Sequence, residues 1–450
     1  MSNALNALRE FIVNSDANIL YENMRRKCND YSTFVPRFKT ISEGIGCLPK
    51  EIRNVLGFLM CGKNMSISDF FKMFGEDLFN LFLEKGLLRT FKQEMWLDGF
   101  VFVCYENKVF LINCPNDYEN YNSNLHFKDI EGTMKFLVNQ IKLYRGKKVL
   151  DLFDDFGIVS SVMADDNDIV MYYTNPLAKE IMKINLLLNN VYNKVEFHEN
   201  EKNILGDFDL IIALPDTDII PAGIDSPYPM RGGDLGMDCV IKVLGLVEKN
   251  LVSEGEMILA GMTVADQGGK EFSNVVKEVS GKYKSMVCYQ DGVTINTYID
   301  VYREVMNRFK KTNKEISFQE WATCFGKYSN GKLVNFLFQL KKMKGCQTEI
   351  DYCNDWYRND VPQTIFAGVR EQSTKYILYN EEGRGIEVSA DVYQLISRID
   401  GKKTVNQILA QDGDMEISKD MFREEKFVSL LIQMQKIGLV HKRCLESIKI

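Results

Sequence analysis

The sequence predicts an α/β protein whose centre is a doubly wound, mostly parallel sheet of seven strands. Residues 147–157, KKVLDLFDDFG, have the layout of a buried strand and a tight turn that leads into a helix. From there to residue 309, short apolar runs alternate with longer helical patterns, as they do where helices connect parallel strands. The turn has one glycine, Gly157, where loops that cradle a ligand usually have two or three.

Length and composition bound the protein class. A chain of 450 residues exceeds what one core supports, so two or three domains are expected. Hydrophobic residues make up 45% and charged residues 26%, as in soluble globular proteins. The net charge of -7 speaks against nucleic-acid binding along the whole chain. With no signal peptide and no long apolar run, we expect a cytoplasmic protein without a membrane span.

Cysteine and histidine usage gives no sign of a metal site or of disulfides. The eleven cysteines are scattered and include no CxxC pair, and we expect reduced, mostly buried thiols. The three histidines, His126, His198 and His441, do not cluster. We therefore expect no metal centre.

Residues 1–125 are expected to form a winged-helix-like domain, because short helical segments precede a β-hairpin. An aromatic stripe with helical spacing predicts a core face at Phe70, Phe71, Phe74, Leu78 and Phe82. Strand-like runs follow at 88–96, 100–104 and 109–113.

Residues 126–309 carry the alternating pattern of the central domain. The predicted strands are 148–153, 169–174, 194–198, 208–214, 256–262, 285–290 and 294–301. Helices are expected at 175–190 and 236–250, the first starting at Asn175 with Pro176 behind it. In such a sheet the carboxyl ends of the strands converge on one ligand crevice.

Residues 310–450 are expected to form a third, α+β region that ends in a winged helix. A charged linker leads to two predicted helices, 317–327 and 332–343. A β-rich part follows through Val369 and residues 376–379.

Five segments in this order resemble a known family: VLDLFDDFG, TNPLAKEIMKINLLLNN, FDLIIALPD, RGGDLGMDCVIKVLGLVEKNL and SEGEMILAG. Over about residues 130–305 the chain is similar to class I S-adenosylmethionine (SAM) dependent methyltransferases, in the group that includes release-factor glutamine and rRNA guanine methyltransferases. The resemblance implies a Rossmann-like sheet, SAM as cofactor, and methyl transfer to a peptide, protein or small-molecule acceptor.

The resemblance also implies the site residues. The cofactor-binding candidates are Asp151, Phe153, Asp155, Gly157, Tyr173, Asn175, Asn200 and Leu214. The catalytic candidates are Tyr228 and Asp216; Asp216 is chosen from the residues, as the acid next to the end of the fourth strand, where it could act as a general base, orient a substrate amine or take a plain helix-start or turn role.

The chain departs from the family at three functional positions. Phe153 and Asp155 stand where the family has glycines, and Tyr173 stands where an acid accepts hydrogen bonds from the ribose. Leu214 replaces the asparagine of Asn-Pro-Pro-Tyr, and leucine cannot hold an acceptor nitrogen.

Two substitutes for the lost groups remain open. Asp151, Asp154 or Asp155 could take the ribose or the cofactor's amino group, because a cationic sulfonium favours nearby carboxylates; a solvated turn is the alternative at Asp154 and Asp155. Residues 226–228, Ser-Pro-Tyr, could supply the acceptor clamp or form a rigid loop.

The C-terminal segment 386–443 is similar to PqqD-like winged-helix domains, which bind leader segments of peptides being modified. A packing or dimerisation wing is the alternative. Two further functions stay open beside methyl transfer: a degenerate methyltransferase homologue that serves as scaffold or peptide-binding partner of another enzyme, and a protein that keeps the pocket for another ligand. A homo-oligomer or a hetero-complex is compatible with each.

Overall fold

A computed structural model describes the chain in segments. The described residues are 2–14, 45, 50–105, 108–113, 137–138, 140–142, 144–154, 156–173, 176–199, 204, 206–215, 236, 238–265, 283–289, 293–294, 323, 332–343, 349–352, 361–364, 368–372, 375–379, 385–400, 403, 405–410, 427, 430–431, 434 and 439–443. The chain forms two compact units. The first comprises residues 1–281 and 292–337, and the second comprises residues 282–291 and 338–450.

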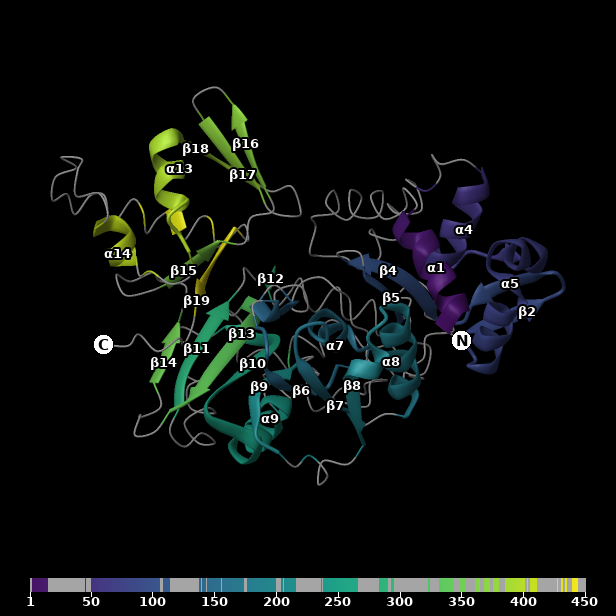
Figure 1. The fold of residues 1–450 in the computed structure, drawn as a ribbon, viewed down its shortest axis with the longest axis horizontal. Helices are drawn as coiled ribbons and strands as arrows, with labels where there is room; N and C mark the ends of the chain where they lie inside the picture. The colour runs from purple at the N-terminus through teal and green to yellow at the C-terminus, as the bar shows by residue number, and fades with distance from the viewer. Residues whose placement is uncertain are drawn as a thin grey trace. The chain divides into compact units, whose positions relative to one another are not determined.

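A mostly parallel sheet is the centre of the first unit (Figure 1). Its strands in this unit are β6 (Lys148–Leu152), β7 (Asp168–Tyr172), β8 (Val195–His198), β9 (Phe208–Ala213), β10 (Leu251–Ala265) and the first part of β13 (Lys332–Lys342), whose residues from 338 on belong to the second unit. They lie side by side in the order β13, β10, β9, β6, β7, β8. All four pairings from β10 to β8 are parallel. The predicted α/β class and the parallel sheet are thus confirmed.

The central strands form because they are apolar on both faces. In β6, Val149, Leu150 and Leu152 are fully buried, and β9 buries Leu210 and its neighbours in the same way. Continuous burial of this kind is typical of a parallel sheet covered by helices. Strands β6, β7, β8 and β9 begin and end within two residues of the predicted bounds.

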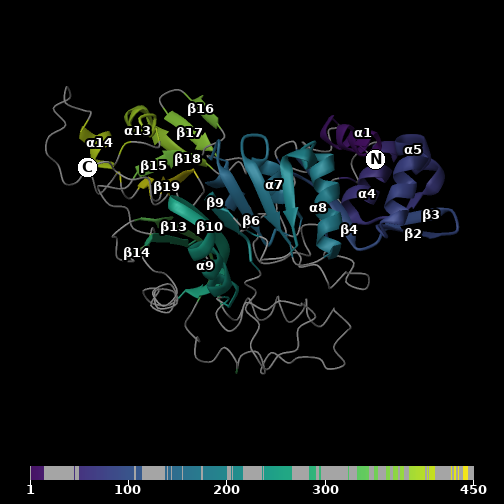
Figure 2. The same cartoon turned by 60° about the horizontal axis from the view of Figure 1, so that its bottom comes forward.

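Three helices connect these strands: α7 (Ile158–Met163), α8 (Pro176–Leu188) and α9 (Asp238–Asn250). Helices α7 and α8 contact each other, whereas α9 contacts β9 and β10 (Figure 2). The chain moves from β6 to β8 on one side and from β9 to β10 on the other. Right-handed crossovers in opposite directions put α7 and α8 on one face and α9 on the opposite face.

One late strand of the sheet differs from the prediction, and another is described only in part. Of the predicted strand 294–301, the structure describes Thr294 alone, which belongs to the short β12 (Val293–Thr294) and pairs with β13; residues 295–301 lie outside the described ones, and the strand there stays a prediction. β13 itself is the segment 332–343 that we predicted as a helix. Phe336, Phe338 and Leu340 alternate along it, but the intervening residues are buried as well. A run buried on both faces loses the period that separates strand from helix.

The N-terminal elements belong to the same unit as the sheet. They are α1 (Ser2–Asn14), α4 (Lys50–Cys61), β1 (Met65–Ser66), α5 (Ile67–Glu84), β2 (Leu88–Phe91), β3 (Glu94–Leu97), β4 (Phe100–Tyr105) and β5 (Lys108–Asn113). β1, β3 and β2 form a small antiparallel sheet, and β4 pairs with β5. Helix α1 packs against α5, α8 and β5. The winged-helix character and the domain boundaries stay predictions.

Two details of this region correct the sequence reading. The run 88–96 is a hairpin instead of one strand, because the chain turns at Lys92, whose φ is 57°. In α5, Phe70, Phe74, Leu78 and Phe82 are buried as predicted, whereas Phe71 is 38% exposed. Gly75 interrupts the helix with φ 79°.

The second unit is rich in strands, as predicted. β11 (Tyr283–Tyr289) runs parallel to β14 (Glu349–Tyr352), and β15 (Val361–Thr364) pairs with β19 (Val440–Arg443). A three-stranded antiparallel sheet is formed by β16 (Gly368–Gln372), β17 (Lys375–Tyr379) and β18 (Gly385–Ser389), followed by α13 (Ala390–Ile396) and α14 (Val405–Ala410). Leu378, Ile396 and Leu431 lie in one apolar core. The predicted helix 317–327 lies outside the described residues except for Thr323. The PqqD-like character stays a prediction.

Among the described segments, no helix combines the length and the apolar composition needed to cross a bilayer.

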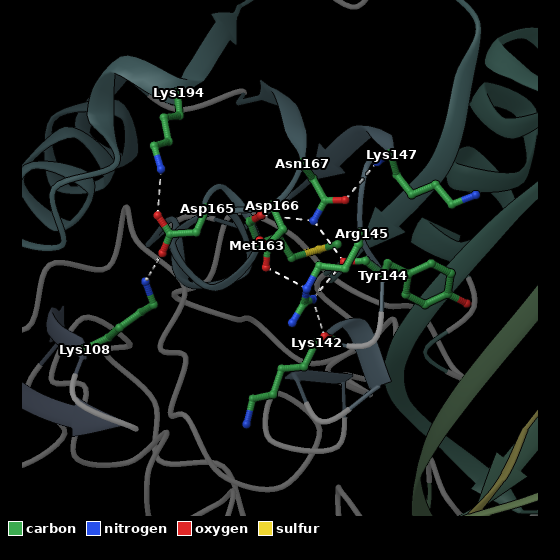
Figure 3. A network of polar contacts seen from close by, with 10 residues as sticks. All are labelled: Lys108, Lys142, Tyr144, Arg145, Lys147, Met163, Asp165, Asp166, Asn167 and Lys194. Carbon is green, nitrogen blue, oxygen red and sulfur yellow. Dashed lines mark hydrogen bonds and ion pairs between the residues drawn. The ribbon is translucent and has the colours of Figure 1, made fainter. Parts of the chain in front are cut away.

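Asp165, in the turn after α7, binds two lysines from other segments (Figure 3). Its Oδ1 is 2.7 Å from Nζ of Lys194, and its Oδ2 is 3.5 Å from Nζ of Lys108 in β5. The hydrogen bond from Lys194 holds the pKa of the Asp165 carboxyl below its ordinary value. Desolvation lowers the pKa of Lys108. Since the turn precedes β7, this contact lies at the amino ends of the strands.

The Asp165 contact should make stability depend on acid pH. A carboxyl whose pKa is lowered by folding stabilises the protein above the pKa of the unfolded chain, about 3.9, and this stabilisation is lost as pH falls through the folded pKa. Asp165→Asn should therefore lower the free energy of unfolding at pH 7 by up to about 1 kcal/mol, since the pair is half exposed, and by less near pH 2. Urea unfolding measures it. An equal loss at both pH values, or no coupling with Lys194→Met, would contradict the assignment.

Candidate functional site

The carboxyl edge of the sheet, where β6, β7, β8 and β9 end, is the candidate site. Strand order reverses there between β6 and β9, and ligands of doubly wound sheets bind outside the strands at such a point. Two backbone hydrogen bonds hold the strand ends together. Leu214 N donates to Leu152 O over 3.1 Å, and Tyr173 N donates to His198 O over 3.1 Å. The residues that follow these four strands therefore start from neighbouring positions.

The turn between β6 and α7 keeps a backbone that suits glycine at two positions. Phe153 has φ 65° and Gly157 has φ 66°. A left-handed conformation costs a phenylalanine about 1–2 kcal/mol. The Phe153 ring is half-buried and meets Tyr172 edge-on, with centroids 6.0 Å apart. Phe153 therefore adopts a backbone conformation that a glycine would adopt without this cost.

Asp154 holds this turn from within. Its side chain is 2% exposed, and its two carboxylate oxygens accept hydrogen bonds from Val159 N over 2.7 Å and Phe156 N over 3.3 Å. Gly157, at the N-cap of α7, has no side chain to cap the helix. Asp154 supplies that cap from three residues upstream. The solvated-turn reading of Asp154 is wrong, because the carboxylate is buried and bonded to the backbone.

Asp151 lies deeper, within β6. It is 1% exposed, and its Oδ2 accepts a 2.5 Å hydrogen bond from Oγ of Ser160 in α7. A carboxylate buried between strand and helix orients the helix start. A ligand at the carboxyl edge would meet Asp151 only if this burial changed, so its role as a cofactor ligand stays a prediction.

Tyr173 is the side chain at the end of β7 that faces a carboxylate. It is 3% exposed, and its hydroxyl donates to Oε2 of Glu199 over 3.2 Å. Nζ of Lys179, in the first turn of α8, lies 4.8 Å from the centroid of the Tyr173 ring. Hydrogen bonding to Tyr173 raises the pKa of Lys179 above its ordinary value. Glu199 itself is exposed.

The pair of Tyr173 and Glu199 places a carboxylate beside the end of β7. A carboxylate accepts hydrogen bonds from vicinal hydroxyls, and a phenol can donate or accept one. Glu199 follows the end of β8, and Tyr173, which follows the end of β7, holds its carboxylate by a hydrogen bond. Among the described residues no group of three histidine, cysteine or acidic side chains could hold a metal ion.

The remaining candidates divide into two groups. Leu214 is 5% exposed, with its amide bonded to β6 and its side chain packed in the interior. The other five lie outside the described residues: Asp155, Asn175, Asn200, Asp216 and Tyr228. Their roles stay predictions.

Sequence reasoning missed one side chain near the site, Lys179, and the capping role of another, Asp154. Lys179 could have been found, because it stands in the first turn of a helix whose start is marked by Asn175 and Pro176. The capping role of Asp154 could not, because a cap from three residues before the N-cap glycine depends on the path of the turn.

No model of a protein family matches the chain, and no curated protein does. Solved structures resemble part of it. The ribosomal protein L11 methylase from Lactobacillus delbrueckii subsp. bulgaricus is 16% identical over 35% of this chain and 72% of its own, with a TM-score of 0.26. StiE O-MT is 14% identical over 45% and 69%, with a TM-score of 0.28. The 4+2 cyclase SpnF is 12% identical over 50% and 86%, with a TM-score of 0.32. These likenesses are weak, and a shared fold does not specify an activity.

Proposed function

We propose that the chain binds SAM at the carboxyl edge of its sheet and transfers the methyl group to a peptide, protein or small-molecule acceptor. The observation that supports this most is the pair of Tyr173 and Glu199, which places an exposed carboxylate beside a phenol at the ends of β7 and β8. A ribose with two neighbouring hydroxyls matches this donor and acceptor set. Strand β7 lies beside β6, one of the two strands between which the strand order reverses, and ligands of such sheets bind at that carboxyl edge.

The residues present fit the cofactor in charge as well. SAM carries a sulfonium and an ammonium group, and each is favoured by a nearby carboxylate. Glu199 provides an exposed one, whereas the carboxylates of Asp151 and Asp154 are turned to the interior. We assign the contact with the ribose hydroxyls to Glu199, held in place by the hydrogen bond from Tyr173, and its negative charge also favours a cofactor with a nearby cationic centre.

Bound SAM would supply an electrophilic methyl group, and the chain would supply position. In-line alignment of acceptor and methyl is the main source of rate in such a transfer. Asp216 stands two residues after Leu214, next to the end of β9, and we propose that it accepts a proton from the acceptor or orients it. We propose Tyr228 as a second contact with the acceptor.

Calorimetric titration with SAM and with S-adenosylhomocysteine tests the proposal. Both ligands should bind, and at about one hundred times the dissociation constant they should add about 2.7 kcal/mol to the stability in a thermal melt. Glu199→Gln should weaken binding about tenfold or more, whereas Glu196→Gln, which removes an exposed β8 carboxylate that pairs with His198, should not. Absence of binding at about 1 mM ligand would rule the proposal out.

One observation favours the second candidate, a degenerate homologue that serves as scaffold or peptide-binding partner. The two described positions that depart from the family in hydrogen-bonding chemistry, Tyr173 and Leu214, are 3% and 5% exposed. Buried residues of this kind are suited to packing. Two assays separate the candidates. Transfer of label from methyl-labelled SAM to a peptide mixture requires the enzyme, whereas capture of a protein or peptide partner by a chain that does not bind SAM supports the scaffold; tight SAM binding without any captured partner contradicts the scaffold.

A further inference from the structure

Two asparagines, Asn185 in α8 and Asn189 just after it, cover the outer edge of strand β5. Asn185 accepts from Leu111 N over 2.6 Å and donates to Leu111 O over 3.0 Å. Asn189, next to the end of α8, accepts from Val109 N over 3.0 Å and donates to Val109 O over 2.8 Å. Each amide thus makes the pair of bonds that a neighbouring strand would make.

The spacings on the two elements match. Residues four apart share one face of a helix, and residues two apart share one side of a strand. Asn185 is fully buried and Asn189 is 6% exposed. The hairpin β4–β5 is therefore joined to α8 by buried bonds, and its edge is closed without a third strand.

The two asparagines differ in the acceptor of their third hydrogen bond. Nδ2 of Asn189 donates to Asn185 O within its own helical segment, over 2.8 Å. Nδ2 of Asn185 donates over 2.8 Å to Phe156 O, in the turn between β6 and α7. Only Asn185 thus binds both the N-terminal hairpin and the turn of the candidate site.

The turn is held on both sides of Phe156. Asp154 accepts from Phe156 N, and Asn185 donates to Phe156 O. The Phe156 side chain is fully buried, and a Cβ added to Gly157 would lie 3.6 Å from Met182 of α8. The backbone at the start of α7 is thus fixed by one carboxylate from the turn and one amide from α8.

We propose that Asn185 is a positioning residue that couples the β4–β5 hairpin to the turn of the candidate site. The hairpin, which the sequence assigns to a separate N-terminal domain, then supports the site. The effect on ligand affinity rests on the proposed SAM function; the effect on the turn does not.

Amide hydrogen exchange without ligand tests the coupling, with Asn189→Ala as the matched control for Asn185→Ala. Both variants should speed exchange in β5. Only Asn185→Ala should speed exchange of the amides of residues 156–159, by about fivefold, the factor expected for one neutral hydrogen bond. Equal exchange of the turn in the two variants would overturn the proposal. If the alanine variant unfolds, Asn185→Ser, which keeps an uncharged hydroxyl but is too short to bond the carbonyls of both Leu111 and Phe156, gives the same comparison.

Ligand binding provides the second readout. Asn185→Ala should weaken SAM binding about fivefold to tenfold, and Asn189→Ala should leave it unchanged. In the wild-type protein, saturation with SAM should protect the amide of Leu111 more than that of Val109, because coupling acts in both directions. If the wild-type protein does not bind SAM, the proposed function is contradicted, but the coupling of the hairpin to the turn is not. If both variants bind SAM with equal affinity, the coupling of Asn185 to the ligand is contradicted.

Discussion

Replacing Gly157 by tryptophan is expected to abolish SAM binding while the chain stays folded. Gly157 has φ 66°, and a Cβ there would lie 3.6 Å from Cα, Cβ and Cγ of Met182. The first carbon fits, but an indole has to displace α8 or extend over the carboxyl edge of the sheet. We expect the dissociation constant for SAM to rise at least about a hundredfold, or ~3 kcal/mol, in a calorimetric titration.

Two variants separate crowding from backbone strain. Gly157→Ala should lower the free energy of unfolding only by the cost of a left-handed backbone, about 1–2 kcal/mol, and should keep most of the affinity for SAM. Gly146→Trp is the matched control for the large side chain, because Gly146 has φ 63° and nothing lies within 4 Å of its added Cβ. Unchanged affinity in a folded Gly157→Trp variant would mean that SAM does not bind at this turn.

Asp154→Ala is expected to lower the free energy of unfolding by about 3 kcal/mol. The substitution leaves two backbone amides, Phe156 N and Val159 N, without their buried acceptor at the start of α7. A hydrogen bond to a charged group contributes about 1.5–3 kcal/mol, and an unsatisfied buried donor costs a similar amount. Urea unfolding of the purified chain measures the change.

A second helix N-cap, of ordinary strength, serves as the reference for the loss of stability in Asp154→Ala. Ser66→Ala, at the exposed N-cap of α5 where Oγ accepts from Asp69 N, should cost about 1 kcal/mol. Asp154→Asn keeps one acceptor oxygen and should lie between wild type and Asp154→Ala. A loss at Asp154→Ala no larger than that at Ser66→Ala would show that burial adds nothing to this cap.

The sheet could be predicted where local pattern and tertiary environment agree. The runs that became β6, β7, β8 and β9 are short, apolar and bounded by turn residues, so length alone identifies them. The prediction for segment 332–343 was wrong because its apolar run, followed by Lys341, Lys342 and Met343, also fits a helix. The segment becomes a strand by pairing with β10, which is far away in sequence. The hairpin at Lys92 failed because no glycine marks the turn.

That residues of the candidate site lie at one edge of the sheet could be predicted, but their hydrogen-bond partners could not. That Phe153, Tyr173 and Leu214 follow strands and so share one edge comes from the topology rule. That Tyr173 reaches Glu199, or that Asp154 turns inward to two amides, depends on side-chain directions that the chain fixes only when folded. Asp151 shows the same limit, since a carboxylate in a strand can face a ligand or a helix, and here it faces Ser160.

The closure of the β5 edge by Asn185 and Asn189 has a consequence during synthesis. The bond between Val109 and Asn189 spans 80 residues of chain. A ribosome that adds about 5–20 residues per second makes Asn189 about 4–16 s after Val109. Throughout that interval the nascent hairpin has an open, apolar strand edge of the kind that pairs with other chains. Production yield should therefore depend on how fast the stretch between the hairpin and α8 is translated.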